Sequence, residues 1–314
     1  MKNSKTIGSV IVNYNQGIFL TEALEALLLN NELKEIVIVD DASLDNSVEI
    51  IESFKQIKLI KNEFRMGVSQ SFNKGIDLID TDYVLIQGAD DISLPARAGI
   101  QKDLLNANAN MALINRNSYI DKNGTEIESS TFGQNYGSAY NSFFNLFNNG
   151  NHFCAPAAAF PKELYMMYGG FNPVLQQLQD FFFWLNLAKD HKIVFSNEHV
   201  VKYRIHENNL SLNLTPIKTV RLNREMKAIY RKFFLAFTSG HLNPKLIEPI
   251  IFDGGVKITL ALLKFYMSHA NPAIRELGVE LLNECVLDES VNKSDLEYLG
   301  LTYFDLILLN GNRI

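Results

Sequence analysis

The sequence predicts an α/β protein with a mostly parallel central sheet flanked by helices, followed by a helical C-terminal region. In the first hundred residues, short β-branched runs alternate with segments whose apolar residues have helical spacing, the order typical of parallel sheets with right-handed crossovers. From Thr215 onward, helix signals follow one another without a strand run of comparable strength. We therefore expect an α/β domain over residues 1–214, with halves of about 1–100 and 101–214, and a helical region over 215–314.

The period of the apolar residues places the elements of the first half. Ser43 and Asp45 offer N-caps for the second helix, which carries Val48, Ile51 and Phe54. The expected strands are 7–13, 35–40, 58–61 and 83–87, and the expected helices are 19–29, the segment around 48–54, and 67–79.

Later elements follow from the same patterns. The second half has expected strands at 115–120, 154–160, 192–196 and 199–203, a helix at 178–188, and a loop region at 129–151 with one aromatic helix at Phe143, Phe144 and Phe147. In the C-terminal region, Thr215-Pro216 and Asn271-Pro272 each read as an N-cap followed by proline at the first helical position. Ser294 to Glu297 fits a capping box for a last helix.

Composition excludes several classes of protein. The chain has 314 residues, 47% of them hydrophobic, and a formal net charge of −6, which argues against a nucleic-acid partner. Its two cysteines are far apart, which excludes a zinc ribbon and a disulfide scaffold. The N-terminal apolar stretch is interrupted by Asn13 and Asn15, and no apolar run approaches the roughly 20 residues of a membrane-spanning helix. We expect a soluble, cytoplasmic protein.

Two predicted strands end on adjacent carboxylates. Asp40 and Asp41 follow the second strand, and Asp90 and Asp91 follow the fourth. Neighbouring carboxylates repel each other unless a cation lies between them, and ligands of open α/β sheets bind outside the carboxyl ends of the strands. The pattern predicts a metal-dependent site for an anionic ligand. The alternative, taken pair by pair, is a turn in which the aspartate caps the next helix.

Two further clusters lie in the second half of the domain. Gly169-Gly170 forms a bend ahead of Gln179-Asp180, which opens an aromatic helix, where a carboxylate is stabilised in its ionised form. Arg204 and His206 share a loop after the last strand. A helix cap and a structural histidine are the alternative interpretations.

In this order the four clusters resemble the family 2 glycosyltransferases of the GT-A fold, over about residues 6–211. The resemblance is carried by Ser9–Asn15, Ile38–Asp45, Asn62 with Gly67–Gly75, Ala89–Asp91 with Pro95 and Arg97, Gly169–Phe171, Gln179–Asp180, and Tyr203–Arg204 with His206. It implies a nucleotide-sugar-binding half at about 1–100 and an acceptor-binding half at about 101–214.

The resemblance also implies a mechanism. A nucleoside-diphosphate donor, with a UDP-sugar expected, would lose its sugar to an acceptor hydroxyl with inversion, and Asp180 would be the general base. Mn²⁺ or Mg²⁺ would be held by Asp90, Asp91 and His206. The implied donor contacts are Asn13, Tyr14, Asn15, Asp40, Asp41, Gly67, Asn73, Asp90 and Arg204. The acceptor would be a surface glycan, a lipid-linked oligosaccharide or a protein.

The chain departs from the family pattern at three positions. Gly88 replaces the first acid of the usual Asp-x-Asp-Asp, Gln179 replaces the glutamate beside the base, and Phe182 stands where a second acid is common. A catalytically weak sugar-nucleotide-binding subunit that supports a partner enzyme is therefore the alternative function. A nucleotidyltransferase is disfavoured, since Val12 to Gly17 contains no basic residue for a triphosphate.

The helix expected at 216–237 is basic on one face. It carries six cations, Lys218, Arg221, Arg224, Lys227, Arg231 and Lys232, against one acid, Glu225. Its other face offers Ile217, Val220, Ile229, Phe233 and Phe237. Such a helix can lie on the anionic inner face of a membrane, where lipid-linked acceptors are presented. Packing of the apolar stripe within the protein, or in a homodimer interface, is the expected alternative.

Overall fold

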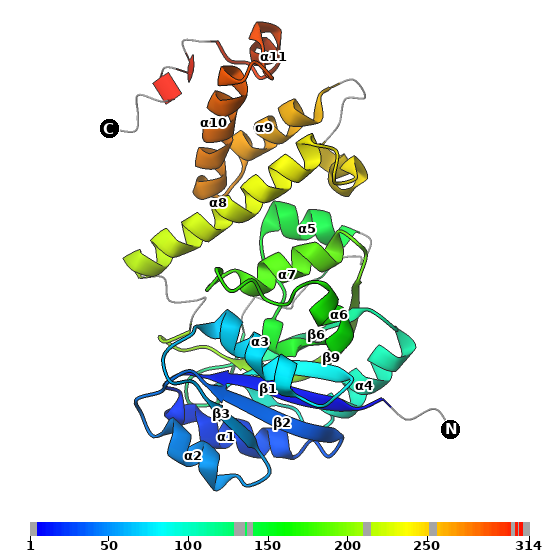
Figure 1. Ribbon diagram of the computed structural model, residues 1–314, viewed down its shortest axis with the longest axis vertical. Coiled ribbons are helices and arrows are strands. Elements are labelled where there is room, and N and C mark those ends of the chain that lie inside the picture. The colour runs from blue at the N-terminus through cyan, green and yellow to red at the C-terminus, as the bar shows by residue number, and fades with distance from the viewer. Residues whose placement is uncertain are drawn as a thin grey trace. The chain divides into compact units, whose positions relative to one another are not determined.

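The computed structural model describes residues 5–128, 136, 141–209, 215–250, 256–302, 305–306 and 308–309. The chain divides into two compact units, Met1–Leu214 and Thr215–Ile314. The first contains the sheet and the second contains helices only, as far as its described residues extend (Figure 1).

The N-terminal unit is built on one mixed sheet with the strand order β3-β2-β1-β4-β8-β6-β9-β5, and β7 pairs with β6. Its strands are β1 (Ile7–Asn13), β2 (Leu33–Asp40), β3 (Lys58–Lys61), β4 (Tyr83–Gly88), β5 (Ile92–Ser93), β6 (Ala112–Ile120), β7 (Glu126–Ile127), β8 (Ala158–Pro161) and β9 (Ile193–Arg204). Strands β3, β2, β1 and β4 are parallel to one another, as are β6 and β9. The carboxyl ends of β1, β2 and β4 therefore meet at one edge of the sheet.

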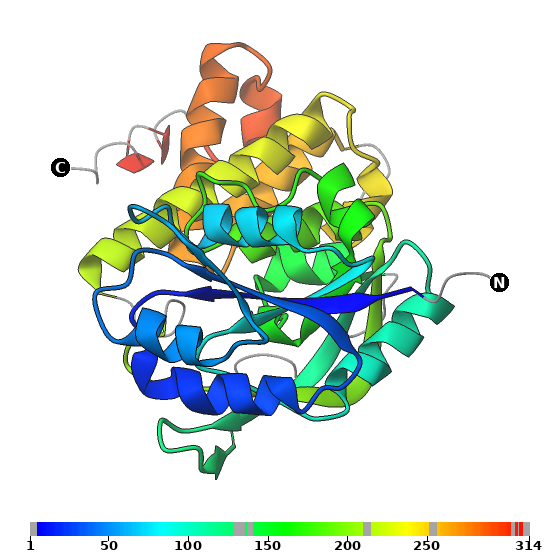
Figure 2. The same cartoon turned by 60° about the horizontal axis from the view of Figure 1, so that its bottom comes forward.

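Helices cover both faces of this parallel part, with α1 and α2 on one face and α3 on the other (Figure 2). The helices of the unit are α1 (Gly17–Leu28), α2 (Ser47–Ser53), α3 (Val68–Leu78), α4 (Arg97–Ala107), α5 (Ser142–Asn149), α6 (Lys162–Met167) and α7 (Gln179–Ala188), with a 3₁₀ turn, η2, at Ala155–Ala157.

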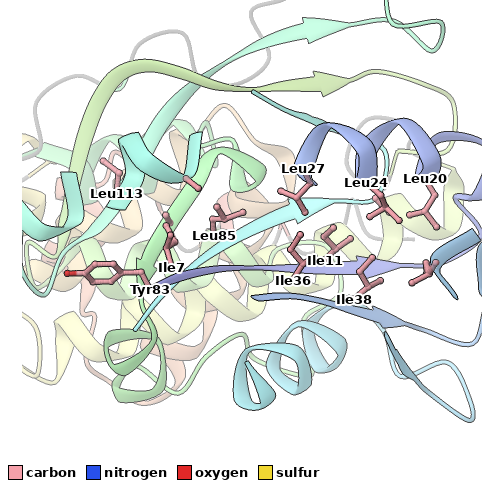
Figure 3. Packing of buried hydrophobic residues seen from close by; sticks show 14 of the residues in the cluster. Ile7, Ile11, Leu20, Leu24, Leu27, Ile36, Ile38, Tyr83, Leu85 and Leu113 are labelled. Atoms are coloured by element: carbon pink, nitrogen blue, oxygen red, sulfur yellow. The ribbon is translucent and has the colours of Figure 1, made fainter. Parts of the chain in front are cut away.

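The main core lies between α1 and the parallel strands (Figure 3). Leu20, Leu24 and Leu27 share one face of α1, since residues four and seven apart stack on a helix, and they pack toward Ile11 of β1 and Ile38 of β2. Burying each such side chain stabilises the fold by roughly 1.5–3 kcal/mol. This core holds in place the strand ends that carry Asn13 and Asp40 and the turn after β4 that carries Asp90.

Most predicted elements of the sheet are confirmed, and β1 and β3 have the expected bounds. Three expectations are wrong in detail. The N-cap of α2 is Asn46, and neither Ser43 nor Asp45, because the helix begins only at Ser47. Residues 154–157 form no strand but lead into the turn η2, because Pro156 has no N–H to donate to a ladder. The strands expected at 192–196 and 199–203 are one strand, β9, which carries the extra residues where its register with β6 shifts on both sides of Arg116. Of the loop region expected at 129–151, residues 129–135 and 137–140 lie outside the described residues, and its aromatic helix is confirmed as α5.

The C-terminal unit contains α8 (Pro216–Thr238), the 3₁₀ segment η3 (Pro244–Ile250), α9 (Ile258–Ser268), α10 (Pro272–Leu287) and α11 (Lys293–Tyr298). Thr215 and Asn271 cap their helices as predicted. The capping box of the last helix is wrong by two residues. It is formed by Asn292 and Asp295, because α11 begins at Lys293 and its orphan amide groups face the Asn292 side chain.

The basic face of α8 is partly neutralised by α10. Lys227 lies 2.7 Å from Glu276 and 3.0 Å from Glu280, and Arg231 lies 2.7 Å from Glu284 and 3.4 Å from Glu280. The Tyr266 hydroxyl of α9 also donates to the Tyr230 carbonyl of α8 at 2.8 Å. The second half of α8 is therefore committed to packing inside this unit.

Over the part of the chain that the structure describes, no helix combines the length and the apolar composition that crossing a membrane requires.

Candidate active site

The first cluster of the site lies where β1 and β2 end side by side, with Asn13 in register with Asp40. The carboxylate of Asp40 accepts hydrogen bonds from Asn13 Nδ2 at 2.7 Å and from Ser43 Oγ at 2.6 Å. Asn15 adopts a positive φ of 53° and is held there by Ser43 Oγ and by the Leu44 amide. Asn13, Asn15 and Asp40 thus shape the rim of one loop, and their predicted contacts with a nucleotide stay predictions.

Asp41 is the anchor of the neighbouring loop. Its buried carboxylate accepts the amide groups of Met66 and Gly67, both at 2.8 Å, together with Asn62 Nδ2 at 2.9 Å and Ser71 Oγ at 3.0 Å. Four donors occupy the lone-pair positions of one carboxylate. The structure thus places Asp41 where it determines the shape of the 62–67 loop, including the left-handed Gly67 (φ 89°) that precedes α3.

Replacing Asp41 by alanine is expected to lower the free energy of unfolding by at least about 2 kcal/mol, because buried N–H donors lose their acceptor. Loss of the loop shape should also weaken UDP binding measured in EDTA. Urea denaturation and calorimetry check both effects. The exposed Asp77 on α3 is the matched control, and its alanine variant should change neither quantity. Unaltered stability in Asp41→Ala would contradict the anchoring role.

Tyr14 carries a partner that the sequence patterns did not reveal. The guanidinium carbon of Arg65 lies 3.9 Å from the centre of the Tyr14 ring, an arrangement in which cation and ring attract each other. Arg65 belongs to the loop that Asp41 holds, so the aromatic residue and the cation come from segments about fifty residues apart. No local signal around Arg65 points to this pairing.

The second acid pair follows β4 in a tight turn. A side chain at position 88 would place its Cβ 2.6 Å from Asp90 Oδ1 and 2.6 Å from Asp91 Oδ2, so both carboxylates would have to move to admit one. The glycine that replaces the usual family acid therefore matches the present positions of the two carboxylates.

The two acids differ in their surroundings. Asp91 is 1% exposed, and its Oδ1 accepts the Arg204 amide at 3.0 Å. Burial, reinforced by the charge of Asp90, raises the pKa of Asp91 well above its usual value. Asp90 is only partly buried. Of the two aspartates predicted as metal ligands, Asp90 is accordingly the more accessible. Asp91 instead connects the turn to the end of β9.

His206 reaches Asp90 directly, with its Nε2 2.8 Å from Asp90 Oδ2. Its Nδ1 accepts the Asn208 amide at 3.2 Å, and its ring packs 4.7 Å from the ring of Phe19. The side chain of Asn209 accepts the His206 amide at 2.6 Å and donates to the Arg204 carbonyl at 3.1 Å. Asn209 was not among the predicted site residues, although it lies three residues after His206.

Arg204 is fully buried and bonded within the protein. Its guanidinium donates to the carbonyls of Asp90 (2.8 Å), Asp121 (3.3 Å) and Lys122 (3.2 Å), and pairs with the carboxylate of Glu22 at 2.5 Å. Antiparallel pairing of β5 with β9 brings these segments together. In this structure Arg204 holds the acid turn in place, and its predicted contact with the donor stays a prediction.

Asn73 connects α3 to the glycine bend. Its Oδ1 accepts the Phe171 amide at 3.0 Å and the Tyr165 hydroxyl at 2.5 Å, and its Nδ2 donates to the Phe171 carbonyl at 2.8 Å. Gly170 has a φ of 65°, and a Cβ there would lie 2.8 Å from Asn73 Oδ1. The bend that leads toward Asp180 is thus fixed against the donor-side helix α3.

Asp180 lies in the first turn of α7, as predicted. Asn151 Nδ2 donates to Asp180 Oδ2 at 2.8 Å, and Asn151 Oδ1 accepts the Phe153 amide at 3.2 Å. Asn151 therefore orients the carboxylate, a role for which its sequence offers no signal. Beyond it lies Cys154, whose thiol pKa is raised by burial and further by the charges of Asp91 and Asp180. Charges from both acid clusters therefore raise the pKa of this one buried thiol.

A divalent cation can be tested against these side chains. Within the described ranges, no group of three or more histidine, cysteine or acidic side chains is arranged to hold a metal. The spacing of Asp90 Oδ2 and His206 Nε2, 2.8 Å, suits two ligands of one cation, and binding there requires the His206 ring proton to move to Nδ1, which now accepts the Asn208 amide. Adjacent ligands of an octahedral cation at about 2.1 Å lie roughly 3 Å apart, and Mg²⁺ is commonly bound by one or two protein groups plus substrate phosphates.

The sequence profile of glycosyl transferase family 2 matches residues 9–169, more than half of the chain. The chain belongs to this family. An uncharacterized glycosyltransferase of Methanocaldococcus jannaschii is 28% identical over 210 residues, 63% of this chain and 70% of that protein. An uncharacterized glycosyltransferase of Haemophilus influenzae is 24% identical over 230 residues, 67% of this chain and 69% of that protein.

The fold is also that of a solved structure. S. aureus TarS in complex with UDP-GlcNAc superposes with a TM-score of 0.61 at 16% identity, over 88% of this chain and 83% of that one. The likeness confirms the GT-A fold that the resemblance implied. As a family 2 member, this protein is a glycosyltransferase.

Proposed function

We propose that the protein is an inverting, metal-dependent glycosyltransferase that moves a sugar from a UDP-sugar to an acceptor hydroxyl. The observation that carries the proposal is the pair of clusters at the site: Asp90 beside His206, and Asp180 oriented by Asn151. The cluster of Asp90 and His206 suits the binding of a diphosphate with its cation. The cluster of Asn151 and Asp180 provides a single carboxylate that can accept a proton. TarS has been crystallised with UDP and with UDP-GlcNAc, which supports a uridine nucleotide as the donor.

Asp90 and His206 would hold Mn²⁺ or Mg²⁺. Asp91, buried behind them, would keep the acid turn in place through its hydrogen bond with the Arg204 amide. When bound, the cation would offset the negative charge of the diphosphate leaving group. Asn13, Tyr14 and Asn15 would line the pocket for the base, where Arg65 already lies on the Tyr14 ring.

Asp180 would take the proton from the acceptor hydroxyl. Asn151 holds one of its carboxylate oxygens, and the start of α7 stabilises the charge that a base needs. A single base with a single displacement on the anomeric carbon inverts its configuration. Loss of the usual glutamate at Gln179 leaves this arrangement in place.

Incubation of the purified protein with a panel of UDP-sugars and Mn²⁺ tests the proposal. Release of UDP, or sugar transfer followed by mass spectrometry, is the expected result, and inversion should show in the NMR coupling constant of the product's anomeric proton. Tight binding of UDP-sugars without hydrolysis or transfer would instead identify a sugar-nucleotide-binding subunit.

We further propose that the acceptor is presented at an anionic membrane surface, in surface-glycan or lipid-linked oligosaccharide synthesis. The first half of α8 supports this proposal. Ile217 is 75% exposed and Val220 is 50% exposed, and Arg221 and Arg224 are exposed beside them. Apolar side chains flanked by cations suit the boundary between lipid headgroups and acyl chains. The second half of the basic face is engaged by α10 and is excluded from this surface.

The double variant Arg221→Glu/Arg224→Glu is expected to lose binding to liposomes that contain anionic lipid, since each cation near such a surface contributes about 1 kcal/mol. Co-sedimentation at low and high salt measures the effect, and binding of the native protein should fall as salt rises. Charge reversal at the exposed Lys55 and Lys122 is the matched control. Equal binding by both double variants would contradict the proposal and favour a soluble acceptor.

A further inference from the structure

A fully buried polar network lies behind the two clusters of the site. Its members are Gln87 on β4, Arg97 and Gln101 on α4, and Asn115 on β6, each with 0% of its surface exposed. None of them belongs to the nucleotide, metal or base residues proposed above. Buried polar groups with satisfied hydrogen bonds restrain the segments that they join.

Arg97 is the centre of this network. Its Nε donates to Gln101 Oε1 at 3.1 Å and one terminal nitrogen donates to Gln87 Oε1 at 3.1 Å. The other terminal nitrogen donates to two carbonyls, that of Ile86 at 2.9 Å and that of Pro156 at 2.6 Å. One planar guanidinium thus contacts β4 and the turn η2 at the same time.

The β4 side of the network leads to the acid turn. Gln87 receives the Arg97 hydrogen bond and in turn donates from its Nε2 to the Asp91 carbonyl at 3.2 Å. Ile86 and Gln87 are the last buried residues of the strand before Gly88 and the acid pair. The position of Asp90 and Asp91 along the strand axis therefore depends on how Arg97 holds β4.

The η2 side leads to the base. Gln101 Nε2 donates to the Ala157 carbonyl at 3.0 Å and to Asn115 Oδ1 at 3.0 Å. The Ala157 amide donates to the Cys154 carbonyl at 2.9 Å, and the Phe153 amide donates to Asn151 Oδ1 at 3.2 Å. These hydrogen bonds, joined by the covalent backbone of residues 153, 154 and 157, lead to the side chain that orients Asp180.

Stability alone does not account for a cation at this place. Burial lowers the pKa of Arg97 to about 10, which reflects the cost of removing the guanidinium from water, and its hydrogen-bond acceptors are neutral. Well-packed apolar residues commonly replace buried charges without loss of stability. A rigid, planar donor that bonds two backbone segments supplies what an apolar side chain lacks, a defined spacing between those segments.

We infer that Arg97 is a positioning residue, which sets the spacing between the donor-side acids and the Asn151–Asp180 pair through its simultaneous bonds to β4 and η2. The inference rests on the proposed function for its catalytic consequence. A displacement of about 1 Å between reacting groups can lower a rate by on the order of 100-fold.

Arg97→Lys tests this inference, because lysine keeps the charge but has one nitrogen in place of the fork. We expect hydrolysis of UDP-GlcNAc by water to slow by about 10- to 100-fold, while the dissociation constant of UDP stays within about twofold. Gln101→Glu is the second variant. It is isosteric and can pair with Arg97, but it loses the donor that bonds Ala157 and Asn115, so the same loss of rate is expected if Arg97→Lys does not fold.

Asn30→Ala is the matched control. Asn30 is 3% exposed, and its Oδ1 accepts the Ala98 amide at 3.0 Å, so the variant loosens the same end of α4 without touching the network. It should lower Tm and leave the rate of hydrolysis unchanged. If Arg97→Lys behaves like Asn30→Ala, or loses UDP affinity as strongly as it loses rate, the positioning role is wrong.

Crystal structures separate this inference from the proposed function. The distance between the Asp90 and Asp180 carboxylates should differ between native protein and Arg97→Lys, or Gln101→Glu, and an identical distance would overturn the inference. Absence of hydrolysis by the native protein would count against the proposed function alone, since the comparison of the two distances needs no turnover.

Discussion

Asp180→Asn is expected to lower the rate of sugar transfer by about 10²- to 10⁴-fold, the usual contribution of a positioned general base. The asparagine keeps the size of the side chain and can still bond Asn151 through its carbonyl oxygen, but it cannot take a proton at neutral pH. UDP binding should be unchanged, because no donor contact is proposed for Asp180. Initial rates and calorimetry on the same preparation measure the two quantities.

Asp190→Asn is the control for this variant. Asp190 follows the other end of α7, where it pairs with Lys189 and accepts the Tyr168 hydroxyl at 2.7 Å, so the substitution changes the same charge without touching the site. Its rate should match that of the native protein. A native rate in Asp180→Asn would exclude Asp180 as the base.

Asp90→Ala and His206→Ala are each expected to abolish the metal-dependent part of donor binding. The two side chains form the pair that fits a divalent cation, and each would remove one of its ligands. Calorimetry with UDP should show a large gain in affinity on addition of Mn²⁺ in the native protein and little gain in either variant. In EDTA, the three proteins should bind UDP with similar affinity.

The exposed carboxylate of Asp103 on α4 is the matched control, since Asp103→Ala removes an equal charge away from the strand ends. Asp91→Ala is expected to lose metal-dependent affinity as well, but with a lower Tm, because the Arg204 amide would lose its acceptor. Donor binding that is indifferent to Mn²⁺ and EDTA in the native protein would exclude the metal proposal and leave charge neutralisation to protein side chains.

Local sequence patterns sufficed for the parallel strands β1 to β4 and for the candidate acids. The β-branched runs, the helical spacing of Leu20, Leu24 and Leu27, and the acids directly after two strands are signals that lie within about ten residues of each other. Parallel pairing then brings strand ends to one edge whatever the details of the loops. The same reasoning placed α7 and its first-turn Asp180 correctly.

Roles that depend on partners distant in the chain were beyond those patterns. The predicted donor contacts of Asp41 and Arg204 stay predictions. Their structural roles carried no sequence signal: the Asp41 carboxylate holds the 62–67 loop, and Arg204 bonds carbonyls of the acid turn and of residues 121 and 122. Asn151 and Arg65 belong to no motif, and Arg97, although part of the family resemblance, gave no sign of its hydrogen-bond network. A hydrogen bond between segments that are not neighbours in the chain leaves no periodic trace in either segment.

The basic helix α8 shows the same division between features that local sequence determines and features that tertiary packing determines. Its amphipathic pattern and its capping by Thr215 follow from the sequence, since helix propensity and capping are local. Which of its cations are engaged follows only from the tertiary structure, because Lys227 and Arg231 find their glutamates on α10, about fifty residues later. The sequence alone therefore determined the family, the order of the elements and the acids that reach the edge of the sheet. Tertiary packing decided which of those acids are bonded within the protein and which remain accessible, because burial and partner choice depend on segments that meet only in the folded chain.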